Sequence, residues 1–388
     1  MRKKSKLLVM LLLSVLIAGF FQTSSIQAQE IELKCESAIL VEASTGKILL
    51  EKNPHEKLSP ASITKIMTLL LAMEAIESGK ANLDDKVIVS KNARDIGGTT
   101  AFLDTGEEIS LENLLKSIAI ASANDACVAV AEHIAGSEEG FVNLMNKRAK
   151  ELGMVNTHFV NPHGLPAENH YTTAYDISLM SRALIKHKKI FDWTTVWLDY
   201  LKHTDRSQNN VTMLANTNKL IRWYKGVDGL KTGSHSKAKY CIAATAKRDG
   251  LRLISVIMKA PDTNTRFKEA AKLLDYGFAN YSSIKIAEEE KTINTVKVEK
   301  GLAEKVGVVT GEDFNIIVKK GEEEGIDCKV LLPEKVKAPI KKGQKIGEII
   351  VYKGNQEIAR HELIAEKDVP KITFLQIITR LINQFLRR

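Results

Sequence analysis

The sequence predicts an α/β domain, built from one sheet with flanking helices and a helical subdomain, followed by a small all-β domain. Short β-type runs occur near both ends of residues 29–281, and the segments between them are rich in alanine, leucine and glutamate with helical periodicity. We therefore expect one sheet closed by its terminal strands, with a helical cluster to one side. In residues 282–370, β-type runs alternate with glycine and lysine turns, and no segment has a convincing helical period.

The elements of the first domain follow in order from local signals. Two β-type runs, Ala38–Val41 and Lys47–Leu50, flank a turn and predict a hairpin. Pro60 precedes a helical stretch from about Ser62 to Gly79. The remaining predictions are helices at 110–135, 138–152, 174–187 and 266–278, and a hairpin of strands 239–247 and 251–258.

Residues 1–28 are predicted to be a secretory signal peptide. A basic start at residues 2–6 is followed by a 15-residue apolar run, Leu7–Phe21, and residues 26–28 fit a cleavage site. An uncleaved anchor is the alternative, and both predict export of the remaining chain. The net charge of +9 falls to +5 without the four cations of this segment. We expect a peripheral protein on the outer face of the cytoplasmic membrane, and no nucleic-acid partner, because no arginine stripe with interleaved aromatic residues occurs.

The sequence predicts no cofactor and no metal site. His361-Glu362 lacks the second histidine of H-E-x-x-H, which argues against a metallo-carboxypeptidase, and His163 and His170 are interpreted as loop histidines. No C-x-x-C pair occurs, which excludes a zinc ribbon. We interpret as structural thiols the four scattered cysteines, Cys35, Cys127, Cys241 and Cys328.

Three short motifs occur in a fixed order. Ser62-Ile63-Thr64-Lys65 comes first, Ser122-Ala123-Asn124 follows, and Lys231-Thr232-Gly233 begins 107 residues after Asn124. Each motif alone is weak, since the first could be a helix cap with a solvated lysine and the last an ordinary turn. Together they match the S-x-x-K, S-x-N and K-T-G set of penicillin-interacting serine acyl-transferring enzymes.

The spacing within the first motif suits nucleophilic catalysis. A serine hydroxyl is a poor nucleophile until a base takes its proton. Ser62 and Lys65 share one face of a helix, so hydroxyl and amine can meet above the helix N-terminus, which would stabilise an oxyanion. Lys65 must be partly neutral, and we expect burial and a second cation, Lys231, to lower its pKa. Ser122 would relay a proton to the leaving amine, and Asn124 would hold the substrate backbone.

The sequence resembles the low-molecular-mass penicillin-binding proteins, which are serine D-alanyl-D-alanine carboxypeptidases. Beyond the motifs, the likeness includes Asp228–Gly233, Asn161–Leu165 and much of residues 260–278, and it extends over essentially the whole chain. The resemblance implies a transpeptidase/β-lactamase-like fold for the first domain. It also implies removal of the terminal D-alanine from peptidoglycan stem peptides through an acyl-serine intermediate, which β-lactam antibiotics also form.

The resemblance assigns roles to two sets of residues. The implied catalytic set is Ser62 as nucleophile, Lys65 as base, Ser122, Asn124 and Lys231. The implied substrate-binding set is Thr232, Gly233, Ser234 and Arg266. Arg266 matches the family arginine that helps bind the terminal carboxylate, and an exposed surface cation is the alternative for it.

The chain departs from the family pattern on or beside the expected substrate strand. Ser234-His235 stands where Thr-Thr or His-Thr is usual, and Lys239 stands where a glycine commonly precedes the tyrosine. Lys259 replaces a glycine before Ala260. These departures bear on substrate preference and turnover rather than on the chemistry.

Two alternative functions share the motifs. A class A β-lactamase also needs a glutamate, and Glu139–Asn143 has the expected Glu-x-x-x-Asn spelling. It lies only 15 residues after Asn124 in a helical pattern, so we interpret it as a coincidence. A non-catalytic envelope-binding protein that kept the fold is the second alternative, and the intact motifs argue against it. No G-x-S-x-G elbow supports an α/β-hydrolase.

The segment 371–388 is predicted to form an amphipathic helix on the membrane surface. Fifteen residues, 374–388, are too few to span a bilayer, and they suit an interfacial helix attracted to anionic lipid. A helix packed on the β domain is the alternative. The apolar half comprises Phe374, Leu375, Ile377, Ile378, Leu381, Ile382, Phe385 and Leu386.

Overall fold

The computed structural model describes residues 31–204 and 210–385, so the signal peptide predicted at 1–28 lies outside the described residues. An antiparallel five-stranded sheet has the order β2-β1-β9-β8-β7. Its strands are β1 (Ser37–Glu42), β2 (Ile48–Lys52), β7 (Val227–His235), β8 (Lys239–Arg248) and β9 (Leu251–Ala260). The N-terminal strand β1 pairs with β9, which confirms the expected sheet closed by terminal strands.

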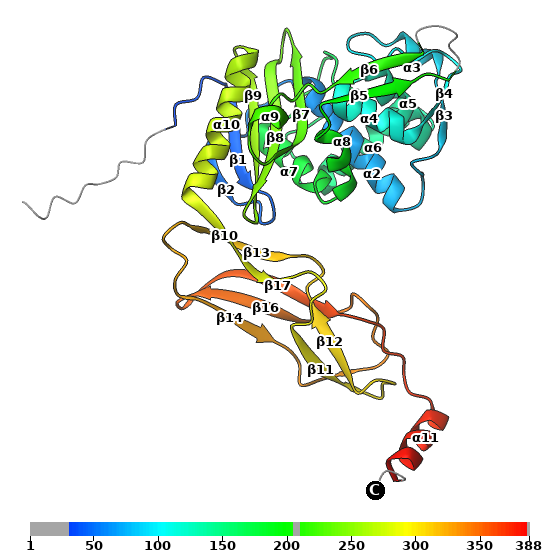
Figure 1. Cartoon of the computed structure of the whole chain (residues 1–388), viewed down its shortest axis with the longest axis vertical. Coiled ribbons are helices and arrows are strands. Elements are labelled where there is room, and N and C mark those ends of the chain that lie inside the picture. The colour runs from blue at the N-terminus through cyan, green and yellow to red at the C-terminus, as the bar shows by residue number, and fades with distance from the viewer. Residues whose placement is uncertain (1–30, 205–209, 386–388) are drawn as a thin grey trace, which may run out of the picture. The chain divides into compact units, whose positions relative to one another are not determined.

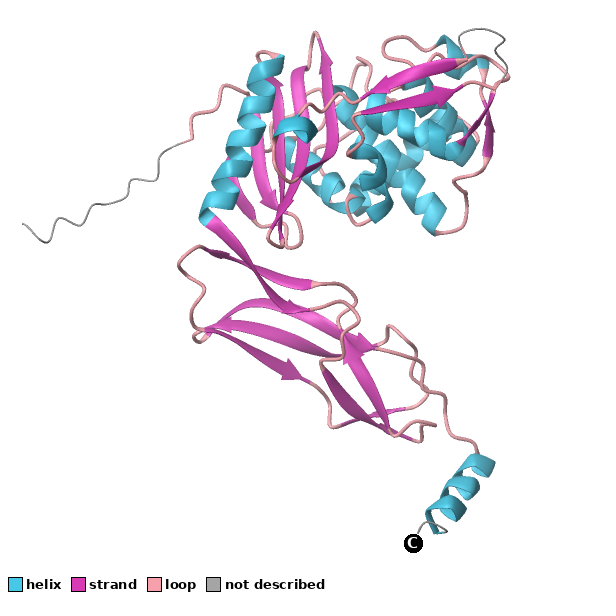
Figure 2. Cartoon of the chain, in the orientation of Figure 1, coloured by secondary structure: helices cyan, strands magenta, loops and turns pink. Residues whose placement is uncertain are grey.

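Helices cover the sheet on both sides. Figure 1 shows α10 on one side and the cluster containing α2, α4, α5 and α6 on the other, and Figure 2 separates the helices from the strands by colour. The helices are α2 (Lys65–Glu77), α3 (Lys91–Asp95), α4 (Leu111–Ala121), α5 (Asn124–Ala135), α6 (Glu138–Glu151), α7 (Ala174–Leu184), α8 (Phe191–Thr194), α9 (Leu220–Trp223) and α10 (Thr263–Asn280), with 3-10 turns η1 (Ala61–Thr64) and η2 (Lys188–Ile190).

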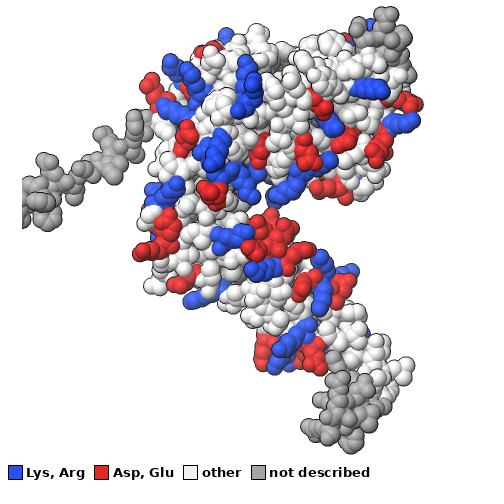
Figure 3. Space-filling view, viewed as in Figure 1, with Lys and Arg blue, Asp and Glu red and all other residues white. Residues whose placement is uncertain are grey.

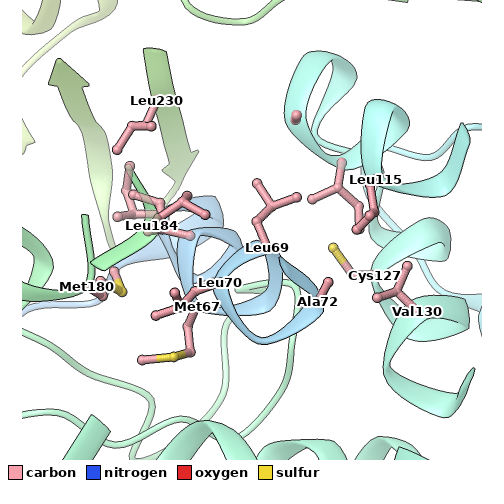
Figure 4. Close-up of a cluster of buried hydrophobic side chains, with 14 of the residues drawn as sticks. Met67, Leu69, Leu70, Ala72, Leu115, Cys127, Val130, Met180, Leu184 and Leu230 are labelled. Atoms are coloured by element: carbon pink, nitrogen blue, oxygen red, sulfur yellow. The ribbon is translucent and has the colours of Figure 1, made fainter. Parts of the chain in front are cut away.

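The central helix α2 is buried on nearly all sides. In Figure 4 its side chains lie between α4 and α5 on one side and Met180, Leu184 and Leu230 on the other. Leu69 and Leu70 are 0–1% exposed. A helix that is apolar all round must lie within a core, and this one carries Lys65 at its first position. The turn that carries Ser62 therefore adjoins a helix that is buried in the core.

The single helix predicted over 110–135 is wrong in one respect, because the chain breaks it into α4 and α5. Ser122 ends α4 with φ +67°, in the left-handed region, and its N–H donates to Ser117 O. Helix α5 then begins at Asn124. The break carries no glycine or proline, so local signals did not reveal it. Its effect is to place the second motif at a junction instead of on a helix face.

Two short hairpins were not predicted. Strand β3 (Lys86–Ile88) pairs with β4 (Glu108–Ser110), and β5 (Leu198–Lys202) pairs with β6 (Val211–Ala215). Their alternation is brief, since β3 and β4 have three residues each and β5 and β6 have five. A buried pair links them, since His203 Nδ1 lies 2.8 Å from Glu107 Oε1, and both side chains are at most 1% exposed.

The residues after α10 form strands, as predicted. A six-stranded sheet has the order β14-β16-β17-β12-β11-β15, and β10 pairs with β13. Exposed ion pairs such as Lys345 with Glu362 (2.7 Å) cross β16 and β17, and Figure 3 shows both charge signs interspersed over the visible face. The strands are β10 (Tyr281–Ala287), β11 (Asn294–Glu299), β12 (Lys305–Val309), β13 (Phe314–Lys319), β14 (Ile326–Leu331), β15 (Lys335–Lys337), β16 (Lys345–Lys353) and β17 (Gln356–Ala365).

The last described element is the helix α11 (Phe374–Phe385), at the position predicted for an amphipathic helix. Among residues 31–204 and 210–385, no helix has both the length and the apolarity required to cross a bilayer.

Candidate active site

Ser62 stands in the tight turn η1, directly before α2, so the predicted helix starts three residues later than Ser62. Ala61 is held in the left-handed region at φ +48°. Gly164, at φ +87°, packs so closely that a Cβ would overlap the Ala61 carbonyl oxygen. Thr64 Oγ1 also lies 2.9 Å from His170 Nε2. Burial lowers the pKa of His170 to about 3, so this neutral imidazole holds the turn in place.

Lys65 is the centre of the site. Its Nζ donates to Ser62 Oγ at 3.1 Å, to Asn124 Oδ1 at 2.7 Å and to the carbonyl oxygen of His163 at 2.6 Å. The side chain is 0% exposed. Burial lowers the pKa of Lys65 below its ordinary value, because a desolvated ammonium is less stable than a neutral amine. The predicted meeting of Ser62 and Lys65 is thus present.

Lys231 lies on β7 and is 1% exposed. Burial lowers the pKa of Lys231 well below its ordinary value, and repulsion from Lys65 and Arg266 lowers it further. Burial is thus the main cause at both lysines. The repulsion between their ammonium groups is mutual and opposes charging of both. The expected effect of Lys231 on the pKa of Lys65 stays a prediction.

The second motif contributes two side chains in different ways. Asn124 accepts from Lys65, and its Nδ2 donates to Gly97 O at 2.7 Å. Its first role is therefore to orient Lys65. Ser122 is 6% exposed at the junction of α4 and α5. Among the described residues no hydrogen bond joins the Ser122 hydroxyl to Lys65 or Lys231, so its proton-relay role stays a prediction.

Gly233 lies directly against the nucleophile turn. A Cβ at this position would lie 2.8 Å from Ser62 N and 3.0 Å from Ile63 N and Pro60 O. The glycine lets β7 pack against the nucleophile turn. The role of Gly233 in substrate binding, which the resemblance implies, stays a prediction. Ser234, the next residue on this edge strand, is exposed and accessible.

Sequence reasoning missed Thr217. Thr232 Oγ1 donates to Thr217 Oγ1 at 2.8 Å, and Lys231 Nζ lies 3.5 Å from the same atom. The flanking Asn216 and Asn218 are buried, and their side-chain amides donate to backbone carbonyls, including Gly229 O at 3.1 Å. The Asn-x-Asn spelling was the available signal. It indicates a loop fixed by its own amides beside the K-T-G strand.

Arg266 is 6% exposed, so the alternative of an exposed surface cation is wrong. Its Nη1 donates to Gly233 O at 3.2 Å and to Cys241 O at 3.3 Å. Burial lowers the pKa of Arg266 to about 10, and its guanidinium stacks 4.6 Å from the Phe267 ring centroid. A buried cation thus lies beside the end of β7.

Two of the sequence departures share one backbone feature. Lys239 has φ +52° and Lys259 has φ +56°, in the left-handed region that glycine enters without steric cost. A residue with a Cβ is less stable there by about 1–2 kcal/mol. This accounts for the glycine usual in the resembled family. Lys259 regains a contact through its ion pair with Glu36 at 2.6 Å.

The positions of Glu138 and Glu139 on α6 bear on the class A β-lactamase alternative. Glu139 is exposed on α6, so its carboxylate faces solvent. The preceding Glu138 instead contacts His163 Nε2 at 3.5 Å, and this supports the loop whose carbonyl accepts from Lys65. The interpretation of the Glu-x-x-x-Asn spelling as a coincidence agrees with this geometry.

The buried cysteines are Cys35, Cys127 and Cys241, whereas Cys328 is exposed, and all four are free thiols. Burial raises the pKa of Cys127 to about 12 and that of Cys241 to about 11, so both are protonated and behave as small apolar side chains.

Comparison with family models gives two matches. A model described as D-alanyl-D-alanine carboxypeptidase matches residues 23–262. A second, described as the C-terminal domain of penicillin-binding protein 5, matches residues 281–371.

Individual relatives agree along the chain. The D-alanyl-D-alanine carboxypeptidase DacF of Bacillus subtilis is 40% identical over 389 residues, covering 100% of this chain and 99% of that protein. DacC of Escherichia coli is 34% identical over 361 residues, covering 90% of this chain and 88% of that protein. The crystal structure of penicillin binding protein 5 from Haemophilus influenzae matches with a TM-score of 0.69 at 31% identity, covering 88% of this chain and 98% of that one.

The contact of Gly233 with the nucleophile turn generates a testable prediction. Gly233→Ala must displace β7 or the turn by several tenths of an ångström, because its Cβ would lie 2.8 Å from backbone. We expect at least a tenfold slower reaction of Ser62 with a fluorescent penicillin. Gly311→Ala is the matched control, since its Cβ would meet only the flexible end of Ile364, and it should react at the wild-type rate. A wild-type rate in Gly233→Ala would contradict the tight packing.

Proposed function

The chain belongs to the D-alanyl-D-alanine carboxypeptidase family, and from this premise we propose that Ser62 is its acylated nucleophile and Lys65 the base. The protein is a serine-type peptidase that removes the terminal D-alanine from peptidoglycan stem pentapeptides, and penicillin acylates it. The function and fold expected from the resemblance are thereby confirmed. The observation that carries the assignment of residues is the buried Lys65 amine, 3.1 Å from the Ser62 hydroxyl.

In the acylation step, the neutral amine of Lys65 takes the proton of Ser62 Oγ as that oxygen attacks the carbonyl carbon of the penultimate D-alanine. The oxyanion forms over the N-terminus of α2, where the backbone dipoles favour negative charge. The peptide C–N bond then breaks. The proton that Lys65 took passes through Ser122 to the leaving amine of the terminal D-alanine, which returns Lys65 to its neutral form; the place of Ser122 beside Asn124 supports this role.

In the deacylation step, a water molecule attacks the ester carbon and gives one proton to Lys65. The ester C–O bond breaks, Lys65 returns its proton to Ser62 Oγ, and the shortened peptide leaves with a free carboxylate. Lys65 serves both steps because it is neutral at the start of each. Asn124 and the His163 carbonyl keep its amine within reach of Ser62 throughout.

Substrate binding is proposed along the edge of β7. Thr232, Gly233 and Ser234 would align the D-Ala-D-Ala end beside the nucleophile, because β7 is the edge strand of the sheet and packs on the η1 turn. Arg266 supports a site for the terminal carboxylate, since its desolvated guanidinium contacts Gly233 O at the end of this edge. Lys231, whose Nζ lies 3.5 Å from Thr217 Oγ1, offers an N–H donor at the same place.

The division of the chain belongs to the same proposal. We propose the boundaries 1–28 for a signal peptide, 29–281 for the carboxypeptidase domain, 282–370 for the β-rich domain and 371–388 for a membrane-binding helix. The proposed signal peptide supports export to the outer face of the cytoplasmic membrane. In α11, Phe374 and Leu375 are 76% exposed, and Ile377 and Ile378 are 39–40% exposed. Such an apolar surface suits insertion at the headgroup level of a bilayer.

Labelling tests the catalytic assignment. Wild-type protein treated with penicillin should give a stable adduct, which mass spectrometry of peptides should place on Ser62. Ser62→Ala should give none, because the nucleophilic oxygen is absent. Lys65→Met, which keeps the side-chain volume, should slow acylation by at least a hundredfold, since general-base catalysis contributes about 10²–10⁴-fold. An adduct that persists in Ser62→Ala would reject the assignment.

Fractionation tests the membrane proposal. Signal-processed protein should sediment with membranes, and deletion of residues 371–388 should move it to the soluble fraction with unchanged penicillin labelling. Replacing both Ile377 and Ile378 with aspartate should have the same effect, because charge on the apolar face opposes insertion. Gln376→Asp is the control and should still sediment. Sedimentation of the truncated protein would place the anchor elsewhere.

A further inference from the structure

His235 carries three contacts that the catalytic assignment does not use. Its Nε2 lies 3.2 Å from Ser59 Oγ. Its Nδ1 accepts from the backbone N–H groups of Lys237 and Ala238, both at 3.2 Å. The ring therefore bridges the β7–β8 turn and the segment that leads into the nucleophile turn, which lies 176 residues away in sequence.

These contacts determine the tautomer. An imidazole nitrogen that accepts from two N–H groups carries no hydrogen, so Nδ1 is unprotonated and the hydrogen is on Nε2. Nε2–H then donates to Ser59 Oγ. Protonation of Nδ1 would place its N–H opposite the two backbone N–H donors. Because Nδ1 could then no longer accept, both turn hydrogen bonds would be lost.

The position of this bridge matters for the reaction. Ser59 is next to Pro60, whose carbonyl oxygen is one of the three atoms within about 3 Å of a Cβ built on Gly233. The strand and the turn meet there through backbone packing, and the glycine supplies no side chain to fix their spacing. His235, two residues along β7, supplies that fixation from the strand end.

We propose that His235 is a positioning residue, which ties the end of strand β7 to the Ser59–Pro60 segment and so holds the substrate edge against Ser62. This inference rests on the proposed role of Ser62 and adds to it. It also gives a function to the Ser234-His235 departure. The two nitrogens of the histidine ring contact the turn and Ser59 at once, whereas the shorter threonine side chain has a single hydroxyl group and cannot make both contacts.

The link from His235 to Ser59, called the tie below, responds to pH. Burial, then the charge of Lys237 on the same turn, lowers the pKa of His235, and the neutral His170 behind the nucleophile turn is within its electrostatic reach. A histidine with a lowered folded pKa stabilises the fold fully above its unfolded pKa of about 6.5. That contribution is lost as the pH falls toward the folded pKa. The tie should therefore hold at neutral pH and weaken in acid.

Acylation kinetics with a fluorescent penicillin test the proposal on the full-length, signal-processed protein. In His235→Asn, Oδ1 can accept the turn N–H groups in place of Nδ1, but no atom reaches Ser59. Ser59→Ala removes the other partner. Above pH 7 each should acylate about three- to tenfold more slowly than wild type, the size expected for one lost hydrogen bond. The double variant should be no slower than either single variant.

Two further readouts separate positioning from general destabilisation. The ratio of wild-type to His235→Asn rates should fall toward one as the pH falls through the lowered pKa of His235, because the wild-type imidazole then becomes charged. Ser59→Thr, which keeps the hydroxyl, should react near the wild-type rate. His361→Asn, on strand β17 of the six-stranded sheet, is the matched control and should match wild type at every pH. Melting temperatures identify any variant that unfolds under assay conditions.

The outcomes are distinct. Additive losses in the double variant, or a rate ratio independent of pH, would overturn the tie. Equal rates in wild type and Ser59→Ala would also overturn it. In all of these cases, labelling of Ser62 would still proceed to completion and the proposed function would stand. Only a failure of wild-type Ser62 to be labelled would reject the function itself.

Discussion

The burial of one ammonium group is the constraint on which the rest of the site depends. Lys65 is removed from water, which favours its neutral form, and its three hydrogen-bond acceptors come from three separate segments of the chain. A lysine in solvent would be charged at neutral pH and could not take a proton from serine. The fold therefore supplies both the desolvation and the oxygen atoms that keep the amine aimed at Ser62.

The architecture meets this demand by placing the first turn of α2 inside the core. Apolar side chains hold α2 from both sides, and the Gly164 loop and β7 close over η1. Close packing at Gly233 and Gly164 leaves little freedom for the nucleophile turn. Charge repulsion between Lys65 and Lys231 is tolerated because burial already lowers both pKa values. Reactivity thus follows from packing as much as from the identity of the catalytic residues.

Much of this arrangement could be predicted from sequence, and the failures have physical causes. Strong periodicity and ordered motifs predicted the terminal-strand sheet, α2, α10 and the meeting of Ser62 with Lys65. The break at Ser122 was missed because its left-handed backbone has no glycine to mark it. Thr217 and the His163 carbonyl were missed because they reach the site through tertiary contacts. A backbone carbonyl can also come from any residue type, so no sequence pattern marks it. The close packing of Gly233 on the turn was missed for the same reason, because it joins two backbone segments that lie far apart in sequence.

Direct titration of Lys65 tests the central claim. Lysine labelled with ¹³C at Cε would be followed by NMR against pH, and the Lys65 signal assigned by its absence in Lys65→Arg. The account predicts a midpoint clearly below the ordinary lysine value of 10.5. Asn124→Ala should lower that midpoint, because it removes one of the three acceptors that favour the charged form. A wild-type midpoint at or above 10.5 would contradict the claim that burial prepares Lys65 as the base.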